Sequence, residues 1–194
     1  MKTPLITQKK RVLRLILGLA FIPAVFGTAL VVLVQAEWLR LFHVPTGAMA
    51  PAIAPGDRVV MESVSYLRGA PARGDIVIFR TDGIERLPAG QRYTFRVVGM
   101  PGEHILIKQG QVFINRQPIE MANEAGRINY VPPGQGSHTP LHLDMTVPVG
   151  EFFVLGDNSA NSFDSRFYGT IPPRNILGRV VFCYWPWNRA RSVR

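Results

Sequence analysis

The sequence contains a single cysteine, Cys183, and only four lysines among its 194 residues. One cysteine excludes an internal disulfide and a cysteine-rich metal site, so we expect Cys183 to be a small buried hydrophobe. The lysines stand at positions 2, 9, 10 and 108, which leaves only Lys108 outside the first ten residues. A reaction that needs a lysine in the body of the chain would depend on that one residue.

Acidic residues are also few, with 13 Asp and Glu against 22 Lys and Arg and a formal net charge of +9. The basic residues are spread along the chain, apart from the N-terminus and the last six residues, and no nucleic-acid motif accompanies them. We therefore expect no nucleic-acid partner, and membrane phosphates match the charge better. With 47% hydrophobic and 18% charged residues, the composition predicts one globular domain plus an appendage.

The N-terminal region predicts a membrane anchor. Residues 1–14 carry five basic side chains and no acidic one, and residues 15–36 carry no charge at all. This pattern indicates a cytoplasmic basic tail, then a transmembrane helix, with residues 37–194 on the other side of the membrane. Val34-Gln35-Ala36 would also suit a cleavage site, but the apolar run is longer than the roughly 7–15 residues of a signal peptide. We therefore favour an uncleaved anchor.

Short runs of β-branched and aromatic residues between turns predict a mainly β domain over residues 37–194. Its core is expected at about 43–100 and 148–187, with a hairpin and loop insertion at about 101–147. Residues 38–43 are interpreted as an amphipathic segment that leaves the bilayer, and residues 118–147 as rich in loops. The expected strands are 58–64, 76–80, 93–99, 105–108, 112–115, 151–155 and 177–185.

Five sequence blocks follow one another in a specific order. They are Pro45–Pro51, Gly56–Val60, Gly74–Val77, Arg96–Glu103, and Gly156–Arg166 with Gly169. In this order they resemble the type I (leader) signal peptidases, membrane-bound serine peptidases that remove signal peptides with a serine nucleophile and a lysine general base. The resemblance covers nearly the whole chain. It implies the β-domain of that family and, as locations, a plasma (inner) or thylakoid membrane with the domain on the periplasmic, extracellular or lumenal side.

Both members of the dyad that the resemblance implies are replaced. The family's first block is proline, serine, glycine, serine, methionine, and its second serine, the nucleophile, corresponds to Ala48 here. The base lysine precedes an Arg-Val pair in the family, where this chain has Phe95. Loss of a serine nucleophile alone costs about a millionfold in rate. A substitution introduced to inactivate an enzyme would explain Ala48 but not Phe95, so a natural double loss is the simpler account.

The residues that support the family's site are retained. By resemblance, the Thr46 hydroxyl and the backbone N–H of Ala48 correspond to an oxyanion hole. Ser162 corresponds to the serine that orients the lysine, and Asp164 with Arg166 to a pair that braces the site. Because the lysine is absent, we interpret these last three residues as structural.

No other residue is a strong candidate for the missing chemistry. Lys108 falls at the end of a predicted hairpin strand, and we assign no catalytic role to the four histidines, His43, His104, His138 and His142. His138 and His142 are four apart, but they lie among prolines and glycines and not on a helix, so we predict no metal site. We expect no cofactor.

The sequence therefore supports two hypotheses about function. The first is a catalytically inactive homologue that acts as a membrane-anchored binding or accessory subunit. Its partners would be signal-peptide-like segments, with Met49 as a candidate contact, an active paralogue or the subunits of a larger membrane complex. The alternative is an active signal peptidase that processes preproteins with non-standard catalytic residues. Near the C-terminus, Tyr184–Trp187 and the arginines that follow suit either a membrane or partner surface, or a core strand with a solvated basic tail.

Overall fold

The computed structural model describes residues 38–123, 126–128, 130 and 142–193, together with residues 25, 27, 28, 31 and 32. Contacts divide the chain into two units, Met1–Leu39 and Arg40–Arg194. The five described residues between 25 and 32 are helical. Within the described residues, no helix is both long and apolar enough to cross a membrane. Most of the predicted span at 15–36 lies outside those residues.

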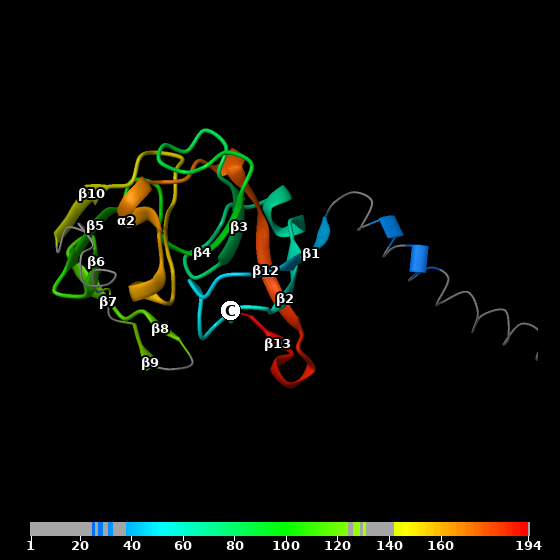
Figure 1. Cartoon of the computed structure of the whole chain (residues 1–194). Coiled ribbons are helices and arrows are strands. Elements are labelled where there is room, and N and C mark those ends of the chain that lie inside the picture. Colours follow the sequence, from blue (N-terminus) through cyan, green and yellow to red (C-terminus); the bar gives the residue numbers. More distant parts are fainter. Residues whose placement is uncertain are drawn as a thin grey trace, which may run out of the picture. The chain divides into compact units, whose positions relative to one another are not determined.

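A seven-stranded sheet forms the larger part of the second unit (Figure 1). Its central strand β3 is buried on both faces from Ile76 to Phe79, which explains its continuous apolar sequence. Strand β2, nearer the edge of the sheet, alternates instead, with Val59 and Met61 buried between more exposed neighbours. The strand order is β1 (Leu39–His43), β2 (Arg58–Glu62), β12 (Ile176–Trp185), β3 (Ile76–Arg80), β4 (Arg92–Gly99) and β11 (Phe153–Leu155), and β13 (Arg191–Ser192) also pairs with β12.

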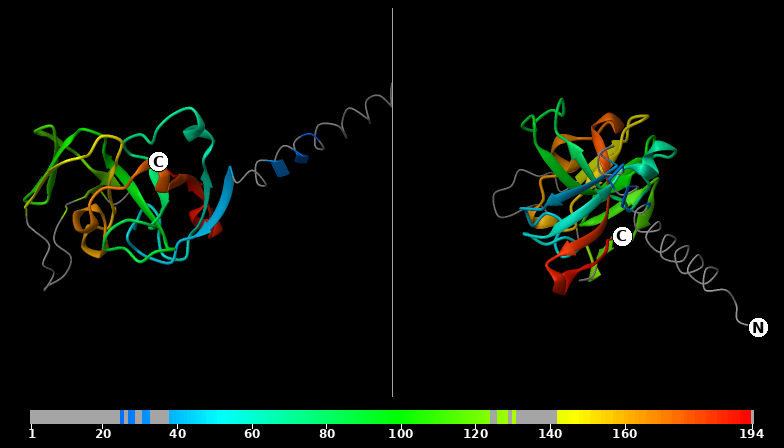
Figure 2. Two further views of the ribbon diagram at one scale, coloured as in Figure 1. Left: turned by 90° about the horizontal axis from the view of Figure 1, so that it is seen from above. Right: turned by 90° about the vertical axis from the view of Figure 1, so that its right-hand side faces the viewer.

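A second, four-stranded sheet is built from the segment between β4 and β11. Its order is β10 (His142–Thr146), β5 (His104–Lys108), β6 (Gln111–Ile114) and β7 (Gln117–Ile119). The turn between β5 and β6 places Gln109 and Gly110 at positive φ, the geometry that a tight hairpin needs. β8 (Ala122–Asn123) pairs with β9 (Gly126–Arg127). In Figure 1 and in the left view of Figure 2, this sheet lies at the opposite end of the domain from β2 and β12.

Strands β4 and β11 are shared by two hydrophobic clusters. Because successive side chains of a strand point to opposite faces, Val97 lies in the cluster of the larger sheet and Val98 in that of the second sheet. Val154 and Leu155 divide in the same way. The two strands therefore form a common wall, and the segment after β11 leaves this wall toward the candidate site.

Helices are short in the described part of the chain. The α-helix α2 (Ser165–Tyr168) begins after Asp164, whose side chain accepts the backbone N–H of Arg166 as an N-cap. The 3-10 helices are η1 (Val64–Leu67), η2 (Ser159–Asn161), η3 (Pro173–Asn175) and η4 (Trp187–Arg189).

The mainly β fold predicted from the sequence is confirmed, and each expected strand is present with its ends moved by a few residues. Six of the described strands, β1, β7–β10 and β13, were not expected. Residues 38–43, interpreted as a segment leaving the bilayer, contain the edge strand β1, in which Leu41 is 66% exposed while Phe42 packs against the core. Part of the region expected to be loops, residues 118–147, forms β10. Cys183 is fully buried, as expected.

Gly178 is a point where β12 approaches β2 too closely for a side chain. A Cβ atom there would lie 2.4 Å from the carbonyl oxygen of Glu62. We expect Gly178→Ala to lower the free energy of unfolding by about 1–3 kcal/mol, because the rigid backbone has to move apart. Urea denaturation measures the change. Gly47→Ala is the matched control, since its Cβ would meet nothing closer than 3.4 Å, and an equal loss in both variants would contradict the prediction.

Candidate functional site

A groove of about 670 Å³ lies in the second unit, next to the loop that carries Ala48. Its walls come from the end of β1 and the following loop, from the first half of β4, and from the segment around η2 and α2. Aromatic and aliphatic side chains dominate its lining, and Arg92 and His43 are the basic residues among those that line it. The lining residues are Phe42–Thr46, Ala48, Ile78, Gln91–Phe95, Ala160–Phe163 and Phe167.

The loop with Ala48 is closed at its base and held from the side. Val44 donates its N–H to the Asp57 carbonyl at 2.9 Å, and Gly56 donates to the Val44 carbonyl at 2.8 Å. Asn158 donates its backbone N–H to the Ala48 carbonyl at 2.9 Å and its side-chain amide to the Gly47 carbonyl at 3.0 Å. These bonds hold the backbone of Ala48 in place, although its methyl group offers no nucleophile.

Phe95 forms part of the apolar lining of the groove. It lies on β4 opposite Val77 of β3 and is 4% exposed. Its ring contacts Tyr93 edge-on, with centroids 6.0 Å apart, and lies 6.2 Å from the ring of Phe79. Such aromatic contacts add about 0.5–1.5 kcal/mol to the burial of the ring. Phe95 is thus part of a packed aromatic cluster and presents no polar group to the groove.

Thr46 and Met49 lie in different environments. Thr46 is exposed, lines the groove, and makes no side-chain hydrogen bond to the described part of the chain, so its hydroxyl is available to a ligand. Met49 is 2% exposed, belongs to the main hydrophobic cluster and is not among the lining residues. Its expected contact with a peptide therefore stays a prediction, and its observed surroundings are the core.

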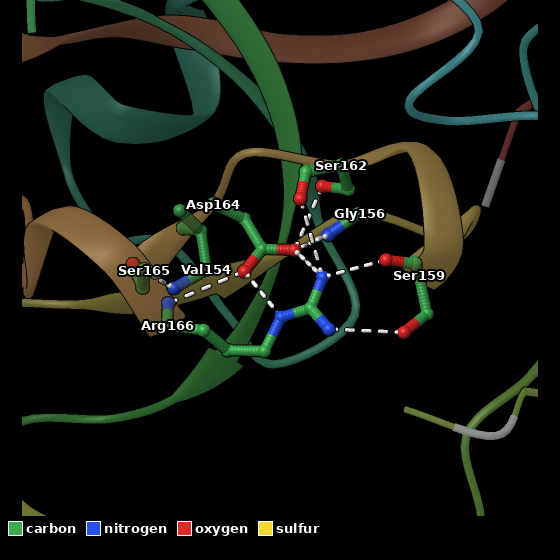
Figure 3. Close-up of polar contacts among 7 residues, drawn as sticks. All are labelled: Val154, Gly156, Ser159, Ser162, Asp164, Ser165 and Arg166. Atoms are coloured by element: carbon green, nitrogen blue, oxygen red, sulfur yellow. Dashed lines mark hydrogen bonds and ion pairs between the residues drawn. The ribbon is translucent and has the colours of Figure 1, made fainter. Parts of the chain in front are cut away.

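Ser162, which lines the groove, lies beside Asp164 (Figure 3). Ser162, which is 4% exposed, donates its hydroxyl to Oδ2 of Asp164 at 2.7 Å. The same oxygen accepts the backbone N–H of Gly156 at 3.0 Å. A Cβ on Gly156 would lie 2.2 Å from the Ser162 hydroxyl and 2.7 Å from the Ala48 carbonyl, so this approach requires glycine.

Arg166 pairs with Asp164 inside the protein. Its Nε donates to Oδ1 at 2.8 Å and its Nη2 to Oδ2 at 3.0 Å, and both side chains are almost completely shielded from water. The guanidinium also donates to the hydroxyl and the carbonyl of Ser159 at 3.0 and 2.9 Å and to the carbonyl of Ser162 at 3.4 Å (Figure 3). The Tyr130 ring lies 5.5 Å from the guanidinium. The Asp164–Arg166 pair therefore fixes the segment that supplies Ser162, and its part in a catalytic site stays a prediction.

A second buried ion pair was not found from the sequence. Arg96 donates Nε and Nη2 to the two carboxylate oxygens of Asp157 at 2.8 and 2.6 Å, and Nη1 to the Gly74 carbonyl at 2.9 Å. Burial alone would lower the pKa of Arg96, but the hydrogen bonds and charge of Asp157 outweigh it and raise that pKa. Arg96 directly follows Phe95, and Asp157 precedes Asn158, which holds the Ala48 loop, so this pair connects β4 to that loop. One indication of this pair was present in the sequence, because Arg96 and Asp157 each lie in one of the five sequence blocks.

The other residues considered as substitutes lie in several places. Lys108 is exposed at the end of β5 and does not line the groove. His43 is exposed and does line it. His104 pairs with Asp144 of β10 at 2.6 Å, His138 lies outside the described residues, and His142 begins β10. In the described part of the chain, no three His, Cys, Asp or Glu residues are grouped so as to hold a metal ion.

Breaking the Asp164–Arg166 pair should be costly. Asp164→Asn leaves a buried guanidinium without its counter-charge, and we expect a loss of about 3–5 kcal/mol in unfolding free energy. Ser162→Ala removes one hydrogen bond to the same carboxylate and should cost about 1 kcal/mol. Chemical denaturation of the two variants gives the comparison. Equal losses would show that the ion pair does not dominate this segment.

Comparison with known proteins places these features in a family. Residues 16–185 match the family model described as signal peptidase, peptidase S26. A signal peptidase I of Leptolyngbya laminosa is 38% identical over 150 residues, which cover 76% of this chain and 69% of the relative. A probable signal peptidase I of Synechocystis is 33% identical over 168 residues, or 82% and 81% of the two chains.

Relatives also occur in plants. The thylakoidal processing peptidase 1 of Arabidopsis thaliana is 35% identical over 77% of this chain, which spans 43% of that protein. A crystal structure of a signal peptidase I from Enterococcus faecalis V583 aligns with 57% of this chain and 97% of its own, with 27% identity and a TM-score of 0.42. On the family match and the sequence identities, this chain belongs to the type I signal peptidase family.

Proposed function

We propose that this chain is a membrane-anchored member of the signal peptidase family that holds an extended peptide in its groove without cleaving it. The proposal is carried by the two residues that line the groove at the dyad positions. Ala48 supplies a methyl group and Phe95 a phenyl ring. Neither can attack a carbonyl or accept a proton.

Other groups in the groove do not replace the dyad. The Ser162 hydroxyl already donates to Asp164, and that carboxylate is paired with Arg166. Thr46 and His43 line the groove as well, but no hydrogen bond joins their side chains in the described structure. Neither Ser162 nor Thr46 therefore has the contact with a free base that catalysis by a hydroxyl requires.

The groove offers free strand edges to an extended peptide. On one side of β4, residues Arg92–Arg96 pair with β3, whereas on the other side β11 pairs only with Arg96, Val97 and Gly99. The edge at Arg92–Phe95 is therefore unpaired within the described residues, and β1 is an end strand of the same sheet. A peptide that adds a strand needs such an edge and apolar pockets, but no nucleophile.

Localisation and partners follow the same proposal. The basic residues 1–14 and the uncharged run 15–36 support a single-pass anchor with a cytoplasmic N-terminus, so the groove would face the other side of the membrane. Plasma and thylakoid membranes both fit, since the relatives include bacterial signal peptidases and thylakoidal processing peptidases. There the chain would bind signal-peptide-like segments without cleaving them, beside an active paralogue or within a larger membrane complex.

An active peptidase with non-standard residues is the alternative, and the names of the relatives favour it. It would require Thr46 or Ser162 as the nucleophile and His43, which also lines the groove, as the base. Purified full-length protein incubated with a preprotein distinguishes the two functions. Cleavage that is abolished by Thr46→Val or Ser162→Ala would establish the alternative, whereas the proposal expects no cleavage.

Restoring only one member of the dyad should restore nothing. We expect Ala48→Ser to stay inactive because no base is present, and Phe95→Lys to stay inactive because no nucleophile is present. The double variant is expected to recover measurable preprotein cleavage. Cleavage by the single serine variant would show that a base other than residue 95 operates in this groove.

Filling the groove should block peptide binding without unfolding the protein. The probe is a fluorescent synthetic signal peptide that ends in Ala-Gln-Ala, titrated into the full-length chain in nanodiscs. We expect Ala48→Leu to weaken binding by at least about tenfold, because the larger side chain occupies the lining at that point. Ala70→Leu is the matched control, since Ala70 is exposed and outside the groove. Absence of binding to the unmodified chain, or an equal effect of both variants, would contradict the proposal.

A further inference from the structure

The last residues of the chain form an ordered arm, defined here as Trp187–Val193. The 3-10 helix η4 is followed by β13, in which Arg191 pairs with Cys183 and Ser192 with Phe182. Val193 is 8% exposed and belongs to the main hydrophobic cluster. At the other end of the arm, Trp187 is 77% exposed. The arm is therefore anchored in the core, and it is not the solvated basic tail that was one of the two interpretations of its sequence.

Arg189 of the arm binds the base of the Ala48 loop. Its Nε and Nη2 both donate to Oδ1 of Asp57, at 3.0 and 2.5 Å. Asp57 is fully buried, its Oδ2 accepts the N–H of Ala54 at 2.9 Å, and its carbonyl accepts the N–H of Val44. A buried carboxylate needs a paired charge. Arg189 thus completes the junction at which the loop begins and ends.

Arg191 binds the middle of the same loop. Its Nη2 donates to the carbonyl oxygens of Pro51 and Ala52 at 3.1 and 2.6 Å. Asn158 holds the Gly47 and Ala48 carbonyls of this loop through separate bonds. The loop is therefore restrained by the arm at Pro51–Ala52 and Asp57, and by the Asn158 segment at Gly47–Ala48.

We propose that Arg189 and Arg191 are positioning residues for the groove. They fix the loop that presents the Thr46 hydroxyl and the backbone N–H of Ala48, and so set the shape of the groove wall from the far end of the chain. Their effect on the loop is independent of what the groove binds. Their effect on ligand affinity rests on the proposed peptide-binding function.

Arg191→Ala is the better test, because Arg191 binds backbone carbonyls of the loop. Removal of Arg189 would instead leave the buried carboxylate of Asp57 without its paired charge. Hydrogen exchange of the full-length chain in nanodiscs reports on the loop directly. We expect protection of the Ile53 and Ala54 amides to fall by about tenfold to a hundredfold, the worth of a hydrogen bond from a charged donor. Amides of the central strands, such as Val97, should keep their protection, and the melting temperature should change little.

The second readout is the affinity for the fluorescent signal peptide. We expect Arg191→Ala to weaken binding by about tenfold, with partial recovery in Arg191→Lys, which retains a charged donor. Arg174→Ala is the matched control, because Arg174 is exposed and its side chain makes no hydrogen bond in the described structure. Unchanged loop exchange in Arg191→Ala would overturn the proposal, whatever the affinity. Faster loop exchange in a chain that binds no peptide would support positioning by the arm and refute the proposed function alone.

Discussion

The buried carboxylate of Asp164 organises the site. It accepts the Arg166 guanidinium, the Ser162 hydroxyl and the Gly156 N–H, and it caps α2. A charge in such a place is stable only when all of these donors are present, because each lost bond leaves the remaining charge poorly solvated. The segment from Gly156 to Arg166 consequently has one favourable conformation. Through its hydrogen bonds to the Gly47 and Ala48 carbonyls, Asn158 connects this segment to the loop that carries Ala48.

The frame of the site does not depend on a polar side chain at residue 48 or residue 95, because neither side chain donates any of its main contacts. The two replacements also suit their surroundings. A lysine base has to be held neutral in a dry pocket, and burial of its ammonium form is unfavourable. Phe95 instead packs against Phe79 and Tyr93. Active sites are commonly less stable than they could be because function requires it, so a site without a reaction to catalyse could gain stability by such replacements.

The strands and the site were predictable to different degrees. Central strands such as β3 are long, apolar and bounded by turns, so their sequence alone identifies them. The edge strand β1 was missed because its aromatic, amphipathic pattern is equally typical of a segment at a membrane surface. The family blocks led to the residues that line the groove at Ala48 and Phe95. The Arg96–Asp157 pair and the contacts of Arg189 and Arg191, however, join residues 61 to 140 positions apart. No local pattern encodes such contacts, and only the folded chain shows them.

The proposed absence of cleavage would also change the kinetics of the groove. A peptidase empties its site by cutting what it holds, so its occupancy is limited by turnover. In a groove without chemistry, a bound segment leaves only by dissociation, and its residence time is set by the off-rate. A membrane anchor would confine both molecules to one plane and raise their effective concentration. Such a chain would govern how long a segment stays shielded from other proteins, and not whether its backbone is broken.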